Sequence, residues 1–110
     1  MSTPVNLLNL REMTGDDKEM EKELFQVFID SAETCLKDLA VSTTPQTAET
    51  WRKQAHALKG ISLSLGAEKL GDLCKQAQES FEADSEEKIK LRNEIEKEYK
   101  KVREYLESLG

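Results

Sequence analysis

The chain has 110 residues, 35% of them charged, and a formal net charge of -6. That length suffices for one domain rather than two, and the acidic balance argues against nucleic acid as the main partner, because binding to phosphates calls for a basic excess. No apolar run approaches the roughly 18 residues of a membrane span, and the N-terminus lacks the basic lead of a signal peptide, so we expect a soluble cytoplasmic protein that does not bind membranes.

The first part of the chain predicts a short helix followed by a long one. Glycine and proline are scarce, strand-like alternation is absent, and good helix formers dominate. A leading helix is expected over residues 5–13, with Val5, Leu8 and Met13 able to face inward, and TGDD ends it. The helix that follows, residues 16–40, should be heavily buried because its apolar stripe is wide. That stripe consists of Met20, Leu24, Val27, Phe28, Cys35 and Leu39, widened by Phe25, Ile29, Ala32 and Leu36.

The second and third main helices meet at a glycine. Thr44 and the proline after it form an N-cap and a helix start, and Gly66 marks the C-terminal end, so the second main helix is expected over residues 45–65. The third starts almost at once and carries Leu70, Leu73, Cys74, Ala77 and Phe81. We interpret Cys74, like Cys35 before it, as a small buried hydrophobic residue rather than half of a disulfide.

The fourth main helix, residues 85–108, begins at a capping box formed by Asp84 and Glu87. Short connections force neighbouring helices to run antiparallel. We therefore predict an all-α protein, an antiparallel up-down-up-down four-helix bundle with a short N-terminal helix. It should form one domain over residues 1–110 and exist as a monomer.

His56, the one histidine of the sequence, is predicted to lie on the outer side of its helix. With His56 at 0° and 100° per residue, the core face lies between about 180° and 260°. It consists of Trp51, Ala55, Leu58, Ser62 and Leu65. Leu63 falls at about -20°, so a leucine is exposed on the same side as the histidine. The pattern disfavours a packed histidine, and it disfavours a metal site because there is no second histidine and the neighbours are cations.

The residues around His56 suit a nucleophile that takes up an anion. Gly60, in mid-helix on the same side, costs roughly 1 kcal/mol relative to alanine and leaves the imidazole easy to reach. Lys59 supplies a positive charge three residues on, and Arg52 and Lys53 add two more. Neutral imidazole is a nucleophile, and the cations could then hold a phosphoryl group transiently attached to it. A plain solvated histidine is the alternative.

Gln78 is expected level with His56 on the next helix. The chain reverses near Gly66, and in an antiparallel pair a residue ten positions before the reversal lies level with one about ten positions after it. Gln78 lies just off the apolar stripe, so its amide could hydrogen-bond the imidazole and fix its orientation. An ordinary surface glutamine is the alternative.

The segment HALKGISLSLGAEKLGDLCKQAQ, residues 56–78, resembles the signature of the histidine-containing phosphotransfer (HPt) domain. That signature reads His-x-apolar-Lys-Gly, small residues, an apolar-Gly-Ala step, then leucines and a Cys or Ala. The segment LFQVFIDSAETCLKDL also resembles the helix that precedes it in the family. The matching positions are His56, Leu58, Lys59, Gly60, Ser62, Leu65, Gly66, Ala67, Leu70 and Cys74.

The resemblance implies a phosphoryl carrier of two-component phosphorelays without kinase activity of its own. His56 would take a phosphoryl group from a receiver-domain aspartate or from a sensor histidine kinase, which can be a hybrid kinase, and pass it to another receiver aspartate. No cofactor is expected on this chain, and the receiver would contribute Mg²⁺. Lys59 would neutralise the phosphoryl charge, and Gln78 would orient the imidazole. The docking face for partners would consist of Arg52, Lys53, Gly60 and Leu63.

Two positions depart from the family pattern. Ile61 stands where a small residue is usual, and Ala77 stands where a larger aliphatic is common, so the third helix could pack closer or Phe81 could compensate. Neither position belongs to the phosphoryl site, so an active domain is expected.

A passive helical-bundle adaptor, which binds receiver or kinase domains without phosphotransfer, is the alternative from another class. A bundle enzyme with its own active site lacks the residues it would need, since there is no nucleotide-binding loop and no second histidine.

Overall fold

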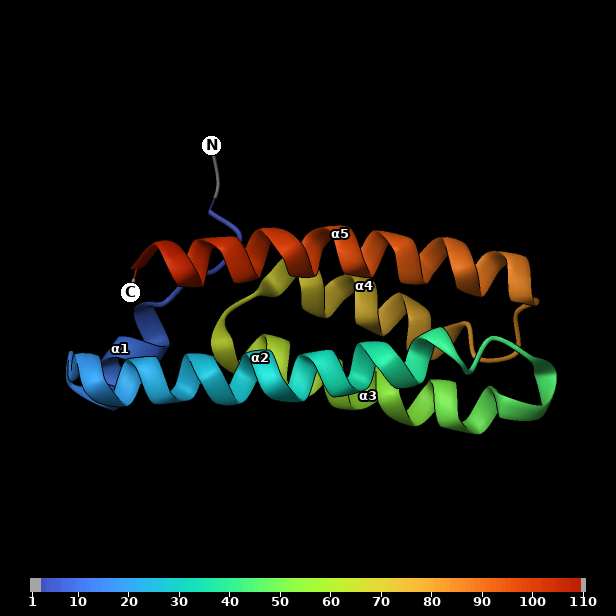
Figure 1. Cartoon of the computed structure of the whole chain (residues 1–110), viewed down its shortest axis with the longest axis horizontal. Helices are drawn as coiled ribbons and strands as arrows, with labels where there is room; N and C mark the ends of the chain where they lie inside the picture. Colours follow the sequence, from blue (N-terminus) through green and yellow to red (C-terminus); the bar gives the residue numbers. More distant parts are fainter. Residues whose placement is uncertain (1–2, 110) are drawn as a thin grey trace.

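The computed structural model describes residues 3–109, and these residues form helices joined by short connections (Figure 1). The elements in chain order are α1 (Leu8–Thr14), α2 (Lys18–Ala40), the 3-10 turn η1 (Pro45–Thr47), α3 (Ala48–Leu65), α4 (Glu68–Glu79) and α5 (Ser85–Leu109). No strand occurs among residues 3–109. The predicted all-helical class is confirmed.

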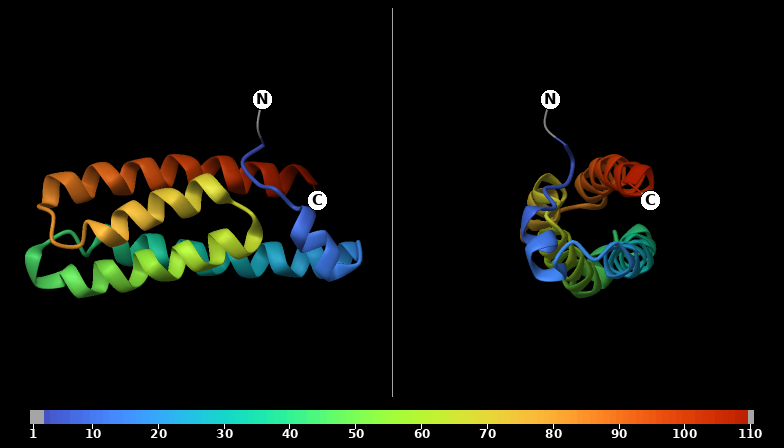
Figure 2. Two further views of the ribbon diagram at one scale, coloured as in Figure 1. Left: turned by 180° about the vertical axis from the view of Figure 1, so that it is seen from behind. Right: turned by 90° about the vertical axis from the view of Figure 1, so that its left-hand side faces the viewer.

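The four longer helices lie alongside one another around a common core (Figures 1 and 2). Along the chain, α2 packs on α3, α3 on α4 and α4 on α5, and α5 also contacts α2. In this last contact the Tyr99 hydroxyl of α5 donates a hydrogen bond to the Glu33 carboxylate of α2 at 2.9 Å, and Arg103 forms an ion pair with the same carboxylate. Helix α1 lies at the end of the bundle where α2 begins (Figure 2).

Local capping interactions set the helix boundaries. The Asp17 side chain accepts hydrogen bonds from the first turn of α2, so this helix starts at Lys18, two residues later than predicted. The predicted second helix starts as a 3-10 turn and becomes α-helical at Ala48. Gly66 ends α3 with a left-handed φ of 100°, and the Glu87 N–H donates to Asp84 at the start of α5.

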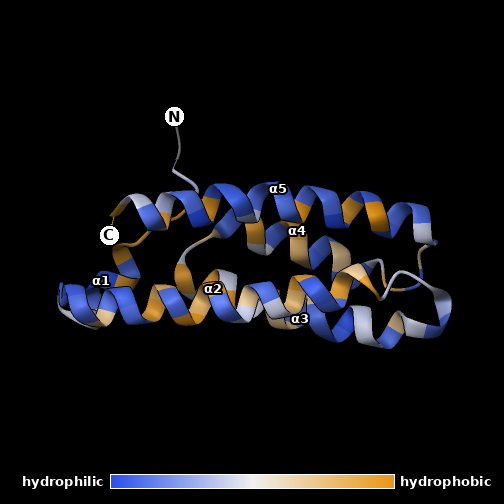
Figure 3. Ribbon diagram, viewed as in Figure 1, coloured by the Kyte–Doolittle hydropathy of each residue, from blue (hydrophilic) through white to orange (hydrophobic). Residues whose placement is uncertain are grey.

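The core forms where the apolar stripes of the helices meet (Figure 3). The predicted core face of α3 is confirmed, because each of its five residues is buried. The Trp51 indole N–H donates to the backbone oxygen of Ala77 at 2.7 Å, which joins α3 to α4 within the core. Cys35 and Cys74 are buried free thiols, as predicted, and burial raises the pKa of Cys74 to about 12.

The predicted inward face of the leading segment is confirmed at Val5 and wrong at Leu8 and Met13. Leu8 and Met13 are 65% and 77% exposed, whereas Leu7 and Leu10 are buried beside Val5. The reason is that the segment before α1 is held to the α3–α4 turn, where the Asn6 N–H donates to the Gly66 oxygen at 2.9 Å. This contact places Leu7 against the core, and the buried stripe then continues three residues on at Leu10.

The predicted apolar stripe of α2 is wider than the face that the bundle covers. The apolar residues of α2 that are buried are Phe25, Phe28, Ile29, Ala32, Cys35, Leu36 and Leu39. Met20, Leu24 and Val27 are exposed, Val27 by 61%. The prediction that these three residues are in the core is therefore wrong. Helix α2 contacts α3 and α5 and has no long helix on its remaining side, so the outer part of its apolar stripe stays open.

Candidate functional site

His56 lies on the outer side of α3, as its helical phase predicts. Its neighbours Ala55 and Leu58 are completely buried, whereas the histidine itself is exposed. Within residues 3–109 there is no group of three or more His, Cys, Asp or Glu residues placed to hold a metal ion. The described helices include none that is long and apolar enough to cross a bilayer. Because the side chain of His56 is exposed, another macromolecule can reach its imidazole.

Gln78 of α4 contacts the imidazole. The distance from His56 Nδ1 to Gln78 Oε1 is 3.3 Å. An amide oxygen accepts hydrogen bonds, so the imidazole tautomer that satisfies this contact carries its proton on Nδ1 and donates it to Gln78. In the neutral ring, Nε2 then holds the free lone pair. The predicted level of Gln78 beside His56 is confirmed.

Gly60 leaves open space beside the imidazole. A Cβ atom added at this position would meet no other heavy atom within 4 Å. Packing therefore does not require glycine here, although glycine in a helix interior costs roughly 1 kcal/mol relative to alanine. The surface of α3 four residues after His56 therefore carries no side chain and is exposed.

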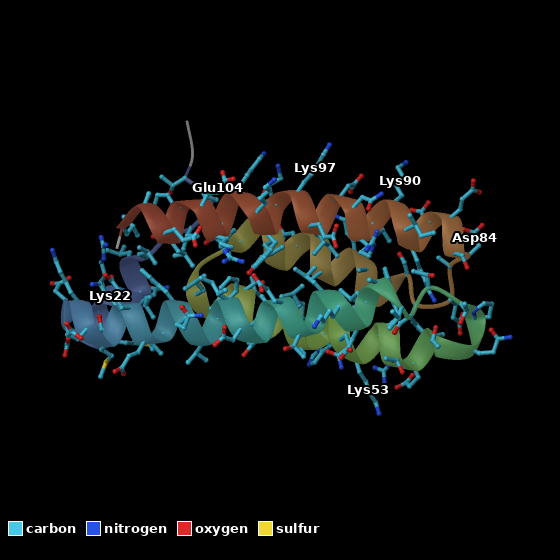
Figure 4. All side chains as sticks on the ribbon, viewed as in Figure 1. Lys22, Lys53, Asp84, Lys90, Lys97 and Glu104 are labelled. Atoms are coloured by element: carbon cyan, nitrogen blue, oxygen red, sulfur yellow. The ribbon has the colours of Figure 1, made fainter. Side chains whose placement is uncertain are left out.

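The positively charged side chains near His56 differ in whether a carboxylate pairs with them. Lys59 is half-buried and Lys53 is exposed, extending outward from α3 (Figure 4). Neither has a carboxylate within 4.0 Å in the described part of the chain. Arg52, by contrast, forms an ion pair with Glu49 and lies 6.0 Å from the ring centre of Phe81.

The Arg52–Glu49 pair changes the charge that the sequence suggested. The hydrogen bond from Arg52 holds the pKa of Glu49 below its usual range, so this carboxylate stays ionised and offsets the guanidinium. The charge of Arg52 is therefore not free for an anion at His56, although the sequence suggested three cations on this side of α3. Lys53 and Lys59 are the neighbouring cations that have no carboxylate within 4.0 Å in residues 3–109.

Leu63 is 50% exposed on the same side of α3, as predicted. It lies over Gly71 of α4, where an added Cβ would come within 2.5 Å of Leu63 Cδ2. Gly71 thus provides the space that Leu63 occupies. Sequence reasoning missed this pair, although a glycine in the first turn of α4, on the same flank as Gln78, was a usable signal.

An apolar hollow of about 200 Å³ lies between α1, α2 and α3. It is lined by Leu10, Met13, Leu24, Val27, Phe28, Ser31, Ile61, Ser64 and Leu65. Ser64 comes four residues after Gly60, so the hollow adjoins the side of α3 that carries the histidine. The sequence pattern predicts Leu24 and Val27 in the core and therefore gives no sign of this surface.

The described geometry can be compared with known proteins. The model of the Hpt domain matches residues 23–109, which include nearly all of α2 and the whole of α3, α4 and α5. No curated protein and no solved structure matches the sequence. The match contains the exposed histidine and the helix that supplies Gln78. The chain therefore belongs to the Hpt domain family.

Proposed function

We propose that this domain relays a phosphoryl group through His56 in two-component signalling. Hpt domains act in histidine phosphotransfer and work with receiver domains and histidine kinases. The observation that carries the proposal is the hydrogen bond between His56 and Gln78, because it leaves the nucleophilic nitrogen of an exposed imidazole free. The donor would be a receiver aspartyl phosphate or a sensor kinase, hybrid kinases included, and the final acceptor a receiver aspartate.

The transfer step follows from the tautomer. The Nε2 lone pair of His56 attacks phosphorus while the bond from phosphorus to the aspartate oxygen breaks, and the carboxylate leaves with the bonding electrons. The ring becomes a phosphorylated imidazolium whose Nδ1 proton still donates to Gln78. In the reverse direction an aspartate oxygen attacks, and the electron pair of the P–N bond returns to Nε2. No proton moves, so the chain needs no general base.

Lys59 is proposed to stabilise the phosphoryl charge. It lies three residues after His56, where side chains on one helix can meet, and it has no competing carboxylate within 4.0 Å among residues 3–109. A unit charge pair at about 4 Å is worth roughly 1 kcal/mol in water and about 4 kcal/mol near a protein surface. Its contribution should therefore be largest when a partner covers the site.

The docking face is proposed to surround the histidine. Gly60 gives access, Leu63 offers an apolar contact, and Lys53 offers a charge, while Arg52 would first have to exchange its pairing with Glu49. The apolar hollow beside Ser64 extends this face toward α1 and α2. An apolar centre with a charged rim is the usual composition of a protein–protein interface.

The remaining parts of the proposal concern the protein as a whole. We infer that α2 to α5 form an antiparallel up-down-up-down four-helix bundle and that residues 1–110 are one domain. The chain would act in the cytoplasm as a monomer and would have no kinase activity of its own. It would bind no cofactor, and Mg²⁺ would be supplied by the receiver domain.

The direct test is transfer of radiolabelled phosphate. The protein is incubated with phosphorylated receiver domains and Mg²⁺, with the His56→Gln variant alongside. We expect label on the wild-type chain alone, stable to base and lost in acid, as for a phosphohistidine. Circular dichroism should show the same helix content and thermal midpoint for both proteins, because His56 is exposed.

An adaptor that binds partners without transferring phosphate would give a different result. It would take no label from any of a panel of receivers, yet wild type and His56→Gln would bind a receiver equally well. Leu63→Glu should weaken receiver binding in either case, because it places a charge in the apolar part of the face. Lys59→Ala distinguishes the phosphoryl relay from the adaptor. Slower phosphoryl transfer with unchanged receiver binding is expected only of a relay.

A further inference from the structure

The side-by-side packing of α3 and α4 brings residues distant in sequence to the histidine. Two contacts define how the helices lie: His56 meets Gln78, and Leu63 lies over Gly71. The two residues on α3 are seven apart, and so are the two on α4, in reversed order. The helices therefore run antiparallel in one constant register over this stretch.

This register places Lys75 beside the candidate site. Lys75 comes four residues after Gly71 and three before Gln78, so the three residues share one flank of α4. Lys75 comes three residues before Gln78, so in the antiparallel register it lies level with the residue three positions after His56. That residue is Lys59. The two lysines thus lie at the same level on opposite sides of the α3–α4 seam, within one turn of the imidazole.

The charge of Lys75 is available for a ligand. Lys75 is exposed, and no carboxylate of residues 3–109 lies within 4.0 Å of its amine. The acids that could pair with it on its own helix are Asp72 and Glu79. A lysine four residues before a glutamate is the less favourable order for such a pair, which agrees with the absence of a salt bridge to Glu79.

We propose that Lys75 is a second cation for the phosphoryl group carried by His56, approaching from α4 while Lys59 approaches from α3. The inference rests on the proposed function. A phosphoryl group on Nε2 extends outward from the seam and carries close to two negative charges near neutral pH. One lysine on each helix would place positive charge on both sides of it. No bond forms or breaks at Lys75, which acts only through its charge.

The test requires no protein partner. Phosphoramidate phosphorylates imidazole directly: Nε2 attacks phosphorus, and ammonia leaves. Phosphorylated wild type, Lys75→Gln, Lys75→Arg and Lys97→Gln are then titrated by ³¹P NMR at low salt, which gives the pKa of the last phosphoryl proton. Lys97→Gln is the matched control, because this exposed lysine extends from α5 on the opposite side of the molecule from Lys53 (Figure 4).

Loss of a nearby positive charge makes the dianion less favourable and so raises this pKa. We expect Lys75→Gln to raise it by about 0.5, the size of one charge several ångströms away in water. Lys75→Arg and Lys97→Gln should match the wild type. The effect should largely disappear in 1 M salt, where the Debye length is about 3 Å. A merely structural role of Lys75 would not produce this salt dependence.

The outcomes separate the two proposals. If phosphohistidine forms and Lys75→Gln titrates like the wild type, the role of Lys75 is refuted and the proposed function stands. The role is also refuted if the shift persists in 1 M salt. If His56 takes no phosphoryl group under conditions that phosphorylate free imidazole, both proposals fall. Circular dichroism of each variant, recorded first, establishes that the fold is intact.

Discussion

Replacing Lys88 by methionine is expected to stabilise the fold by about 1 kcal/mol. Lys88 lies in the first turns of α5, its side chain is completely buried, and its amine has no hydrogen-bond partner among the described residues. The amine lies over the ring of Trp51, whose centre is 5.6 Å away. A positive charge near a helix N-terminus is also unfavourable because of the helix dipole.

The magnitude follows from two opposing terms. A buried polar group without a partner costs about 1–3 kcal/mol, and a charged one costs more. A cation–π contact returns about 0.5–2 kcal/mol. Methionine keeps most of the length and packing of the lysine side chain without the charge, so a net gain of about 1 kcal/mol remains. For a domain of this size that corresponds to a rise in Tm of about 4 °C.

Urea unfolding at two pH values measures both the size and the origin of this effect. Burial lowers the pKa of Lys88, so the unfolded chain binds the proton more tightly than the folded one. The penalty is fully present below the folded-state pKa and disappears as the pH rises through the ordinary lysine value of about 10.4. The difference in free energy of unfolding between Lys88→Met and the wild type, present at pH 7, should therefore become smaller toward pH 11.

The exposed Lys90, which extends outward from α5 (Figure 4), provides the matched control. Lys90→Met should change the free energy of unfolding by less than about 0.5 kcal/mol at either pH. A lower free energy of unfolding for Lys88→Met than for the wild type at pH 7 would refute the burial penalty. A difference in free energy of unfolding that stays constant up to pH 11 would equally refute it.

Three further predictions concern the α3–α4 turn, the packing under Leu63 and the buried thiol of Cys74. Gly66→Ala should lower the free energy of unfolding in urea by about 2–4 kcal/mol, because its φ is 100° and a Cβ would overlap a backbone oxygen of the N-terminal segment. Gly15→Ala, with φ 61° and open space around it, should lower it by about 1 kcal/mol. Equal losses for the two variants would contradict this prediction. Gly71→Ala should displace Leu63 and weaken receiver binding about threefold or more while the thermal midpoint changes little, and unchanged affinity would show that the placement of Leu63 does not matter. The buried thiol of Cys74, with a pKa of about 12, should react with a thiol reagent only as fast as the core opens, so rapid labelling of the native protein would show that the burial is wrong.

Much of the candidate site was predictable because it depends on short-range periodicity. Trp51, Ala55 and Leu58 define the buried side of α3, and the 100° step then places His56 outside. The glycine at position 66 fixes where the chain reverses, and counting outward from that reversal places Gln78 level with His56. Both results require only that the segments be helical and joined by a short turn.

The sequence by itself determined the helices, their approximate ends and the side of α3 that carries the histidine, since these follow from interactions within a few residues. Only the tertiary structure decided which apolar residues are covered, because coverage depends on where neighbouring helices lie. Val27 is open for that reason, although its sequence pattern is that of a core residue. The same holds for Arg52, whose guanidinium lies 6.0 Å from the ring centre of Phe81 beyond the end of α4, and for Lys88, which lies over the ring of the distant Trp51. Such contacts depend on the positions of side chains in three dimensions, which the period of a helix does not specify.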